Sequence, residues 1–392
     1  MQTRPRAGVD RCPCESRESP TRTVAEALLN RADPGGGRPV AISTRLSSRD
    51  LFVGDLCRPV APREPVPRSL VTACIHVVEA YRTLHANGIA YRDISSGNVF
   101  FEPSSGDVLV CDNDNAVFDG QQTGVQGTGP FMAPELVRLE PGAQPSTQTD
   151  LHSLAVLLFM MIMNHHPLEG AAELKIHCFD EVAQKSLYGK HPVFVFDPDD
   201  DSNRPVPGEH DTVIATWRAT PTVLHDLFRT AFTRGLRDPG ARVRESQWRT
   251  TLSRVRDTIV YCHSCGRQNY HDEIEFNKTG YSGTCWRCHK PIILPPRILL
   301  NNRAVMLNRD AVLCEHHLND NARQDPTAIV AAVTPHPARP GTFGLTNRSS
   351  DSWMTVWPDG TTKVVGPNQT VPLRNRLRLQ IRGVRVEIRS SA

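Results

Sequence analysis

The segment from residue 68 to residue 111 restricts the possible folds of this chain more than any other part of the sequence. Apolar residues recur at steps of three and four between Leu70 and Leu84, which predicts an amphipathic helix over 68–87 that Gly88 closes. The polar string Tyr91-Arg92-Asp93-Ile94-Ser95-Ser96-Gly97-Asn98 follows directly. Strand-like runs at 98–101 and 108–111 come next, so the string is predicted to be a loop between a helix and two short strands.

This loop has the form of the protein kinase catalytic loop, H-R-D-x-x-x-x-N, and on these residues the chain resembles the protein kinase superfamily. In that family an aspartate accepts the hydrogen bond of the substrate hydroxyl, and an asparagine five residues later binds a magnesium ion that bridges phosphates. The resemblance assigns these two roles to Asp93 and Asn98. Tyr91 replaces the usual histidine, which supports the loop and transfers no proton, so this departure leaves the assignment intact.

Further motifs follow in the kinase order. Asp112 matches the magnesium-binding aspartate of D-F-G, although Asn113 and Asp114 replace the phenylalanine and the glycine. Asp114 is either an additional ligand or a turn cap, and we prefer the turn cap. The resemblance also implies structural roles for Arg92 in the catalytic loop, Thr128 as a partner of the catalytic aspartate, Glu135 of A-P-E, Asp150 as a holder of the loop backbone, and Arg242 as the partner of Glu135. Their order and spacing predict a mostly helical kinase C-lobe, within a kinase-like domain over 40–258.

The small lobe of a kinase is largely missing from the pattern. A kinase needs a glycine-rich loop over the phosphates and a lysine paired with a helical glutamate. The first lysine here is Lys175, and the only glycine cluster before Asp93 is 35–37, which we interpret as a connector. Residues 40–45 resemble the last small-lobe strand. That leaves 1–39 as an irregular segment with a brief helical run at 24–29.

Two interpretations of this absence stay open. Either the sequence begins at an internal or misassigned start, or the protein is a half-kinase that transfers no phosphate. Ser95 adds to the second interpretation, because the residue two positions after the catalytic aspartate is usually a lysine that steadies the γ-phosphate. We therefore expect a serine/threonine kinase that uses ATP and Mg²⁺ if a small lobe is supplied, and a pseudokinase scaffold otherwise. An in-frame upstream extension that encodes the missing elements would decide for the kinase, and stop codons would decide against it.

Four of the eleven cysteines form two Cys-x-x-Cys pairs, Cys262 with Cys265 and Cys285 with Cys288. Their separation is typical of a zinc ribbon, in which two knuckles complete a tetrahedron around one Zn²⁺. With four sulfur ligands no position remains for water, so the predicted role of this ribbon, residues 259–292, is structural. We expect the neighbouring histidines 263, 271 and 289 to be surface residues. Protein contact is favoured over nucleic acid, because the ribbon lacks a dense basic and aromatic patch.

From residue 293 to the end the pattern changes to alternation and turns, which predicts a small β-rich interaction domain. Two alternating runs, 377–381 and 384–388, flank Arg382-Gly383 as a hairpin would. This region carries arginines that we interpret as a solvated strand face, namely Arg374, Arg376, Arg378, Arg382, Arg385 and Arg389. A nucleic-acid-binding ribbon and tail is the third, less favoured function. The tail also looks distantly like a forkhead-associated sandwich.

The whole set resembles one bacterial family. The motifs that carry this resemblance are the loop 91–98, the string 111–115, the ribbon, His316-His317-Leu318 and Gly344-Leu345-Thr346-Asn347. That family is the serine/threonine kinase-like component of a stress-response triad with a von Willebrand A protein and a metal-dependent phosphatase, so the resemblance implies these as partners. The N-terminus shows no secretory signal and the longest apolar run, 154–163, is too short for a bilayer. We therefore expect a cytoplasmic α+β protein.

Overall fold

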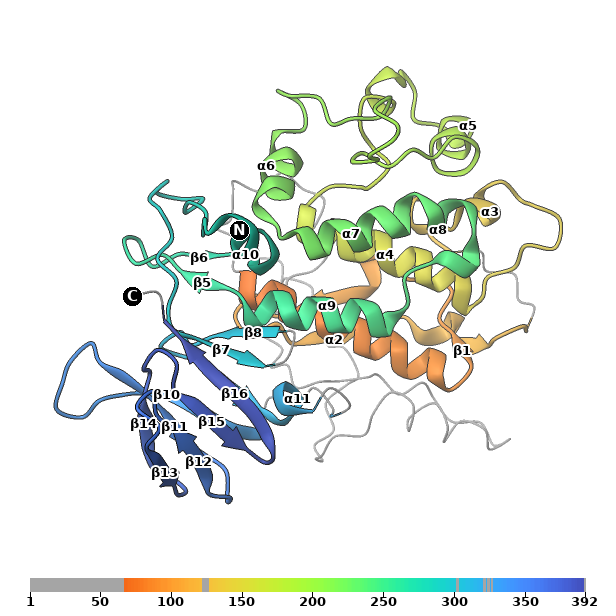
Figure 1. Ribbon diagram of the computed structural model, residues 1–392. Coiled ribbons are helices and arrows are strands. Elements are labelled where there is room, and N and C mark those ends of the chain that lie inside the picture. The colour runs from red at the N-terminus through yellow and green to blue at the C-terminus, as the bar shows by residue number, and fades with distance from the viewer. Residues whose placement is uncertain are drawn as a thin grey trace, which may run out of the picture.

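The computed structural model describes residues 67–121, 127–300, 303–319, 322, 325 and 327–390. The predicted irregular segment 1–39, its helical run at 24–29 and the predicted strand 40–45 lie outside the described residues. Figure 1 shows a helical lobe joined to a smaller β-rich part, with the short strands of the cysteine-containing segment between them. The described part of the chain thus mixes helices and strands, in agreement with the predicted α+β class.

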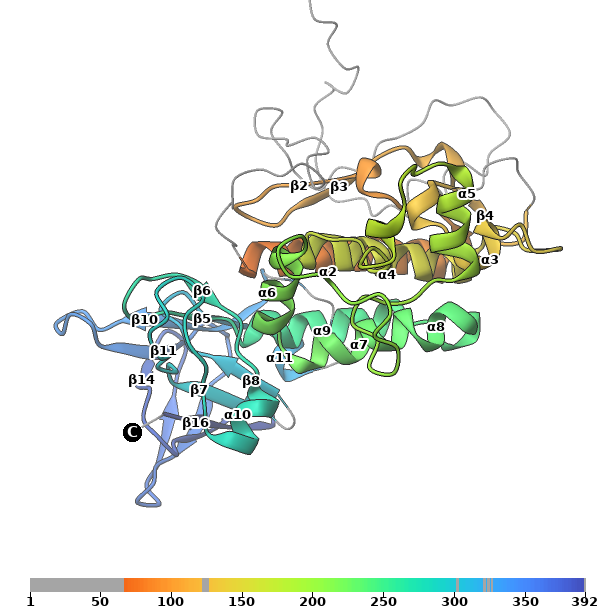
Figure 2. The same ribbon diagram turned by 90° about the horizontal axis from the view of Figure 1, so that it is seen from above.

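The lobe contains most of the helices. Helices α2 and α4 lie against each other and α9 packs along α2 (Figure 2). The helices of the lobe are α2 (Pro67–Ala86), α3 (Pro134–Val137), α4 (Thr147–Met163), α5 (Glu181–Gln184), α6 (Asp211–Ala219), α7 (Thr222–Phe232), α8 (Arg234–Arg237) and α9 (Glu245–Asp257). The predicted helix over 68–87 is therefore present as α2. Helices α7 and α8 are separated by Thr233, whose backbone, with φ of −118° and ψ of −74°, departs from ideal helical values.

Local signals explain where the two central helices begin and end. Gly88 has φ of +70°, the left-handed conformation that ends α2 and that glycine adopts at little cost. Helix α4 begins with a capping box in which Ser146 and Thr149 each bond the other's backbone N–H. It ends at Asn164, which has φ of 52°. From residue 154 to residue 163 α4 is apolar on all sides, so this part of the helix must be buried on nearly all sides.

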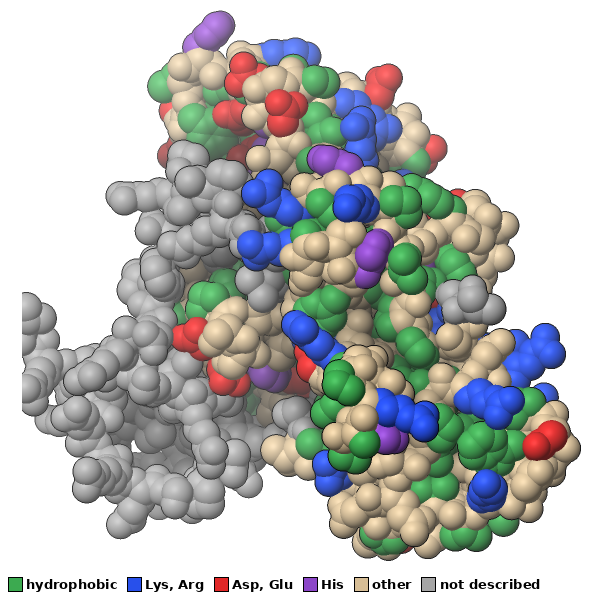
Figure 3. Space-filling model, turned by 90° about the vertical axis from the view of Figure 1, so that its left-hand side faces the viewer, with side chains coloured by type: hydrophobic (Ala, Val, Ile, Leu, Met, Phe, Trp, Pro, Cys, Tyr) green, Lys and Arg blue, Asp and Glu red, His purple; other side chains and the backbone are tan. Residues whose placement is uncertain are grey.

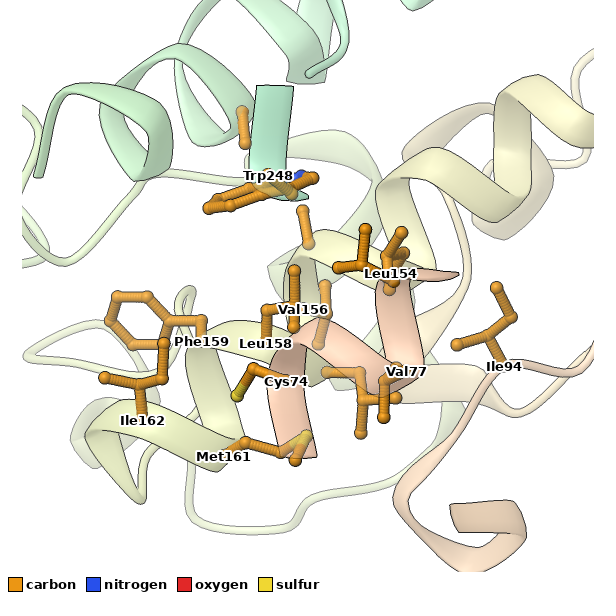
Figure 4. Close-up of a cluster of buried hydrophobic side chains, with 14 of the residues drawn as sticks. Cys74, Val77, Ile94, Leu154, Val156, Leu158, Phe159, Met161, Ile162 and Trp248 are labelled. Carbon is orange, nitrogen blue, oxygen red and sulfur yellow. The ribbon is translucent and has the colours of Figure 1, made fainter. Parts of the chain in front are cut away.

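The core of the lobe lies between α2, α4 and α9. Figure 4 shows Cys74 and Val77 of α2 near Leu154 and Val156 of α4, with Trp248 of α9 in the same cluster. All five side chains are fully buried. Burial of this kind is the main source of stability for the lobe.

Two antiparallel strand pairs carry the loops of the lobe. Strand β1 (Ile89–Ala90) pairs with β4 (Val117–Phe118), and β2 (Val99–Phe101) pairs with β3 (Val108–Val110). The predicted runs at 98–101 and 108–111 are therefore a β-hairpin. Its turn lies on α2, where a Cβ on Gly106 would approach the carbonyl oxygen of Ser69 to 2.4 Å.

The ribbon and the tail follow α9. The ribbon contains β5 (Val260–Tyr261), β6 (Gln268–Asn269) and α10 (Glu273–Thr279). The tail is a sandwich of two antiparallel sheets that share one apolar core, with strand orders β13-β12-β15-β16-β7-β8 and β14-β11-β10-β9. Its elements are β7 (Arg297–Leu300), β8 (Arg303–Met306), β9 (Val312–Cys314), α11 (Glu315–Leu318), β10 (Ile329–Pro335), β11 (Phe343–Asn347), β12 (Trp353–Val356), β13 (Thr362–Val365), β14 (Thr370–Pro372), β15 (Arg378–Ile381) and β16 (Val384–Arg389).

The predicted hairpin of the tail is present, with Arg382 and Gly383 at its turn. Both residues have positive φ, 48° and 82°, as a two-residue hairpin turn requires. Several tail arginines pair with acids, such as Arg378 with Glu387 and Arg382 with Asp351. On the face drawn in Figure 3, Lys and Arg side chains are scattered among uncharged atoms. Within the part of the chain that the structure describes, no helix combines the length and apolar character that a membrane span needs.

Candidate active site

The candidate active site is the loop between β1 and β2, and its central residue is Asp93. The hydroxyl of Thr128 donates a hydrogen bond to Asp93 Oδ1 at 2.6 Å. Asn98 Nδ2 donates to the backbone oxygen of Asp93 at 2.9 Å and to Asp93 Oδ2 at 3.2 Å. The Asp93 carboxylate is thus held from two sides, and the amide oxygen of Asn98 remains as the atom that could bind a cation. Three residues that the sequence placed in one site are together in space.

Asp150 of α4 holds the backbone of this loop. Its carboxylate accepts from Tyr91 N at 2.6 Å and from Arg92 N at 2.9 Å, and it is buried. Arg92 has φ of 76°, a strained conformation for a residue with a side chain. Gly127 passes close to it, because a Cβ on Gly127 would lie 2.8 Å from the Arg92 carbonyl oxygen. Only a glycine fits at 127 while the loop keeps this shape.

Asp150 has a third hydrogen-bond partner, His85, which the sequence did not reveal. His85 Nε2 lies 3.1 Å from Asp150 Oδ2, and His85 Nδ1 contacts Glu245 Oε1 at the start of α9. Burial by itself lowers the pKa of His85, but the hydrogen bonds to Asp150 and Glu245 outweigh it and raise that pKa to about 9. The protonated form of His85 is therefore favoured at this position, where it contacts the aspartate that holds the loop. Its only sequence signal is a histidine near the end of an amphipathic helix, too common to identify it.

Asp112 follows β3 and presents an exposed carboxylate. It adopts the left-handed conformation, with φ of 60° and ψ of 60°, and leads into a 3₁₀ turn over Asn113–Asn115. The hydroxyl of Tyr91 donates to the carbonyl oxygens of Cys111 and, at 3.1 Å, of Asp112. Tyr91 therefore connects the catalytic loop to the Asp112 backbone. Asp114 lies exposed within the 3₁₀ turn.

Glu135 and Arg242 form an ion pair. Arg242 Nη2 donates to the two carboxylate oxygens of Glu135 at 2.8 and 2.7 Å, and the guanidinium also donates to the carbonyl oxygens of Gln148 and Gly235. The Arg242 side chain is only 2% exposed. The pair fixes α3 to the segment between α8 and α9. The hydroxyl of Ser153 adds a contact from α4 to the carbonyl oxygen of Phe131 at 2.7 Å.

The four ribbon cysteines converge. Cys262 Sγ lies 3.6 Å from Cys288 Sγ, and Cys265 Sγ lies 3.6 Å from Cys285 Sγ. A tetrahedral ion with metal–sulfur bonds of about 2.3 Å separates its ligands by about 3.8 Å, so the group fits Zn²⁺. Burial raises the pKa of Cys285, but backbone N–H groups of its knuckle outweigh this and lower that pKa to about 6, which favours the metal-binding thiolate.

One prediction about the neighbouring histidines is wrong. His263 and His289 are exposed as expected, but His271 is buried, with 3% of its surface exposed. Its backbone oxygen accepts from the Thr258 hydroxyl and its Nε2 faces Glu273. It packs there because the ribbon lies against the end of α9 instead of standing apart from the lobe.

Cys314, His316 and His317 form a second group with metal-ligand chemistry. The nitrogens of His317 are both engaged, since Nδ1 accepts from Cys314 N at 2.8 Å and Nε2 lies 3.2 Å from Asp257 Oδ1. His316 Nε2 faces Arg256 at 3.2 Å, and its ring lies against that of His317 in a tilted arrangement, with centroids 4.1 Å apart. These contacts connect α11 to the end of α9, so we assign the group a structural role at the boundary between the lobe and the tail.

Comparison with known proteins supports a kinase relationship for the lobe. The family model "Protein kinase domain" matches residues 62–203. CBL-interacting protein kinase 4 of Oryza sativa subsp. japonica is 30% identical over 127 residues, which cover 30% of this chain and 27% of that protein. Serine/threonine-protein kinase mos of Patiria pectinifera is 28% identical over 105 residues, which cover 24% of this chain and 29% of that protein.

Protein kinase C-like 2 of Schizosaccharomyces pombe is 30% identical over 143 residues, which cover 35% of this chain and 14% of that protein. The chain spans less than a third of the length of each of these relatives. Over residues 62–203 the chain is therefore similar to the protein kinase domain, and in this sense it is protein kinase-like. Such a domain implies ATP and Mg²⁺ as its ligands.

Proposed function

We propose that this protein transfers the γ-phosphoryl group of ATP to serine or threonine hydroxyls of partner proteins. The observation that carries the proposal is the placement of Asp93, whose two carboxylate oxygens are held by Thr128 and Asn98 at the centre of the loop. A carboxylate fixed in this way accepts the hydrogen bond of an incoming hydroxyl in one orientation.

The residues of the chain divide the task between them. Bound magnesium ATP supplies the phosphoryl group and the cations that offset its charge. Asp93 orients the substrate hydroxyl and accepts its proton. Asn98 precedes β2 and Asp112 follows β3, so the two residues flank the β2–β3 hairpin in sequence. Both offer oxygen atoms of the kind that Mg²⁺ prefers. Asp150 keeps the loop in place through two backbone N–H groups.

The proposed context is bacterial stress signalling in the cytoplasm. It rests on the resemblance to the kinase-like component of a triad with a von Willebrand A protein and a metal-dependent phosphatase. On this proposal these two proteins are the partners, and the phosphatase reverses the phosphorylation. The four-cysteine ribbon is proposed to hold one structural Zn²⁺, and the tail to be a protein interaction domain.

A specific observation favours a second candidate, a pseudokinase scaffold that binds partners and transfers no phosphate. Ser95 stands where a kinase usually has the lysine that steadies the γ-phosphate, and the first lysine of the sequence is Lys175. On this alternative the same lobe keeps its shape through the Asp150 and Arg242 contacts, but position 95 offers no lysine to steady the γ-phosphate.

One experiment separates the two functions. The full chain is incubated with radiolabelled ATP, Mg²⁺ and the candidate partner proteins, beside the variants Asp112→Ala and Asp107→Ala. Asp107 is the matched control, since it lies in the β2–β3 turn away from the loop. Magnesium-dependent labelling that disappears only in Asp112→Ala supports the kinase. Absence of labelling, with partners still bound, supports the scaffold.

A further inference from the structure

The residue at the N-cap position of helix α7 makes no side-chain capping hydrogen bond. This residue is Pro221, whose side chain cannot accept a hydrogen bond, although the first N–H groups of any helix need partners. The partner comes from the ribbon, 50 residues later. Asp272 Oδ2 accepts from Thr222 N at 2.7 Å and from the Thr222 hydroxyl at 2.6 Å.

The same carboxylate also caps a ribbon helix. Asp272 is the N-cap of α10, where its Oδ1 accepts from Glu275 N at 3.0 Å. One aspartate therefore serves two helix N-termini, one in the lobe and one in the ribbon, and negative charge is favourable at both. Its placement requires that the ribbon and the lobe keep their relative position.

A second ribbon side chain reaches the start of α2. Gln268 Oε1 accepts from Arg68 N at 2.9 Å, and these residues are 200 positions apart. Gln268 lies on β6, directly after the first cysteine knuckle. Its backbone oxygen accepts from Trp286 Nε1 at 2.9 Å, and Trp286 lies between the two cysteines of the second knuckle. Both knuckles therefore fix the position of Gln268.

The two helices that receive these contacts support the candidate active site. Helix α2 leads through β1 into the catalytic loop. Helix α7 packs on α4, the helix that carries Asp150, through Phe228 and Phe159, whose rings lie 5.0 Å apart. A change in the first turn of either helix thus reaches elements that hold the loop.

We propose that the ribbon is a metal-dependent brace of the lobe, in which Asp272 and Gln268 order the first turns of α7 and α2 only while the cysteines hold their ion. Asp272 and Gln268 are positioning residues in this scheme. The dependence on metal rests on the proposed zinc site, whereas the hydrogen bonds of Asp272 and Gln268 are observed in the structure and involve no phosphotransfer.

The test is site-resolved hydrogen exchange on the full chain, with bound zinc measured on the same samples. The conditions are zinc-loaded protein, protein stripped by a chelator, and stripped protein to which Zn²⁺ is returned. The variants are Asp272→Ala, Asp272→Asn and Gln268→Ala. Asp226→Ala is the matched control, because Asp226 is an aspartate of α7 that pairs with Arg229 and caps nothing.

In the zinc-loaded protein, Asp272→Ala is expected to speed exchange in the first turn of α7 roughly tenfold, the loss typical of a removed N-cap. Gln268→Ala does the same at Arg68. Asp272→Asn has one accepting oxygen in place of two, so it is expected to keep only one of the two caps and to protect α7 or α10 but not both. Asp226→Ala leaves the first turns of α7 and α2 unchanged. Stripping zinc speeds exchange at both turns together, and returning it reverses the effect.

Three results would overturn parts of the proposal separately. Unchanged exchange at α7 in Asp272→Ala would refute the cap. Loss of zinc without any change at α2 and α7 would refute the metal dependence while leaving the cap. A protein that binds no zinc even when it is supplied would refute the zinc ribbon itself, and the Asp272→Ala result would still decide whether the brace exists.

Discussion

Replacing His85 by glutamine removes the charge that lies between Asp150 and Glu245 and leaves a side chain of similar reach. The His85 side chain is 8% exposed and its partners 1% and 13%, so solvent screens the interaction little. Since the pKa of His85 is about 9 in the folded protein and 6.5 as the reference value, the folded state holds its proton more tightly. The difference corresponds to about 3 kcal/mol of folding free energy.

The sign of the pH dependence follows from this direction. A group whose pKa is raised on folding contributes its full stabilisation below the unfolded pKa, near pH 6.5, and loses it as pH rises through about 9. His85→Gln should therefore cost about 3 kcal/mol more at pH 6 than at pH 9.5. The difference between the two proteins at each pH cancels the titration of groups that they share.

Native-state hydrogen exchange of amides in α2 and α4 measures this quantity for the lobe alone, apart from the ribbon and the tail. The stabilities of the wild type and of His85→Gln are compared at both pH values. Glu245→Gln provides a second variant, which should weaken the same pH dependence because it removes one of the two carboxylates. A cost of His85→Gln that is equal at pH 6 and pH 9.5 would show that His85 is not charged in this site.

Three further predictions concern single residues. Arg242→Ala should lower the free energy of unfolding in urea by roughly 3–5 kcal/mol, because it leaves the mostly buried Glu135 carboxylate without its ion-pair partner. Arg242→Lys should lower it less. A loss below about 1 kcal/mol for the alanine variant would contradict this. Gly106→Ala should lower the urea midpoint of the lobe far more than Gly120→Ala. Both glycines have positive φ, but only at Gly106 would the new Cβ lie 2.4 Å from a backbone oxygen. Equal midpoints for the two variants would refute the close contact. Cys288→Ser should abolish stoichiometric zinc measured by elemental analysis, whereas Cys178→Ser, an exposed cysteine outside the ribbon, should not; one zinc retained by Cys288→Ser would exclude the proposed ligand set.

The sequence was informative where a signal is local. The periodic apolar residues of α2, the glycine that ends it and the alternation in β15 and β16 each specify an element within a few residues of chain. The kinase-like order of motifs also predicted that Asp93, Asn98 and Thr128 lie together. It could do so because a shared fold fixes contacts that spacing alone does not. Asp150 and the Arg242 pair occupy the positions that this order implies.

Contacts between distant segments were beyond the reach of the sequence. His85 and Glu245 are 160 residues apart, and nothing local marks His85 as a partner of Glu245 or of Asp150. The sequence around Asp272 indicates only an ordinary N-cap of α10. Its second role, as a cap of α7, depends on α7 lying beside it. His271 was expected at the surface for the same reason, since its burial depends on how the ribbon packs against α9.

The central claim is that Asp93 is the group that orients the substrate hydroxyl for phosphotransfer. The most direct measurement is the initial rate of magnesium-dependent phosphate transfer from ATP to a partner protein by the wild type and by Asp93→Asn at saturating nucleotide. The asparagine keeps the size of the side chain and its contact with Thr128 but cannot accept a proton. If Asp93 has this role, Asp93→Asn should lower the rate by roughly 10²–10⁴ and retain the nucleotide affinity. Equal rates in the two proteins would contradict it.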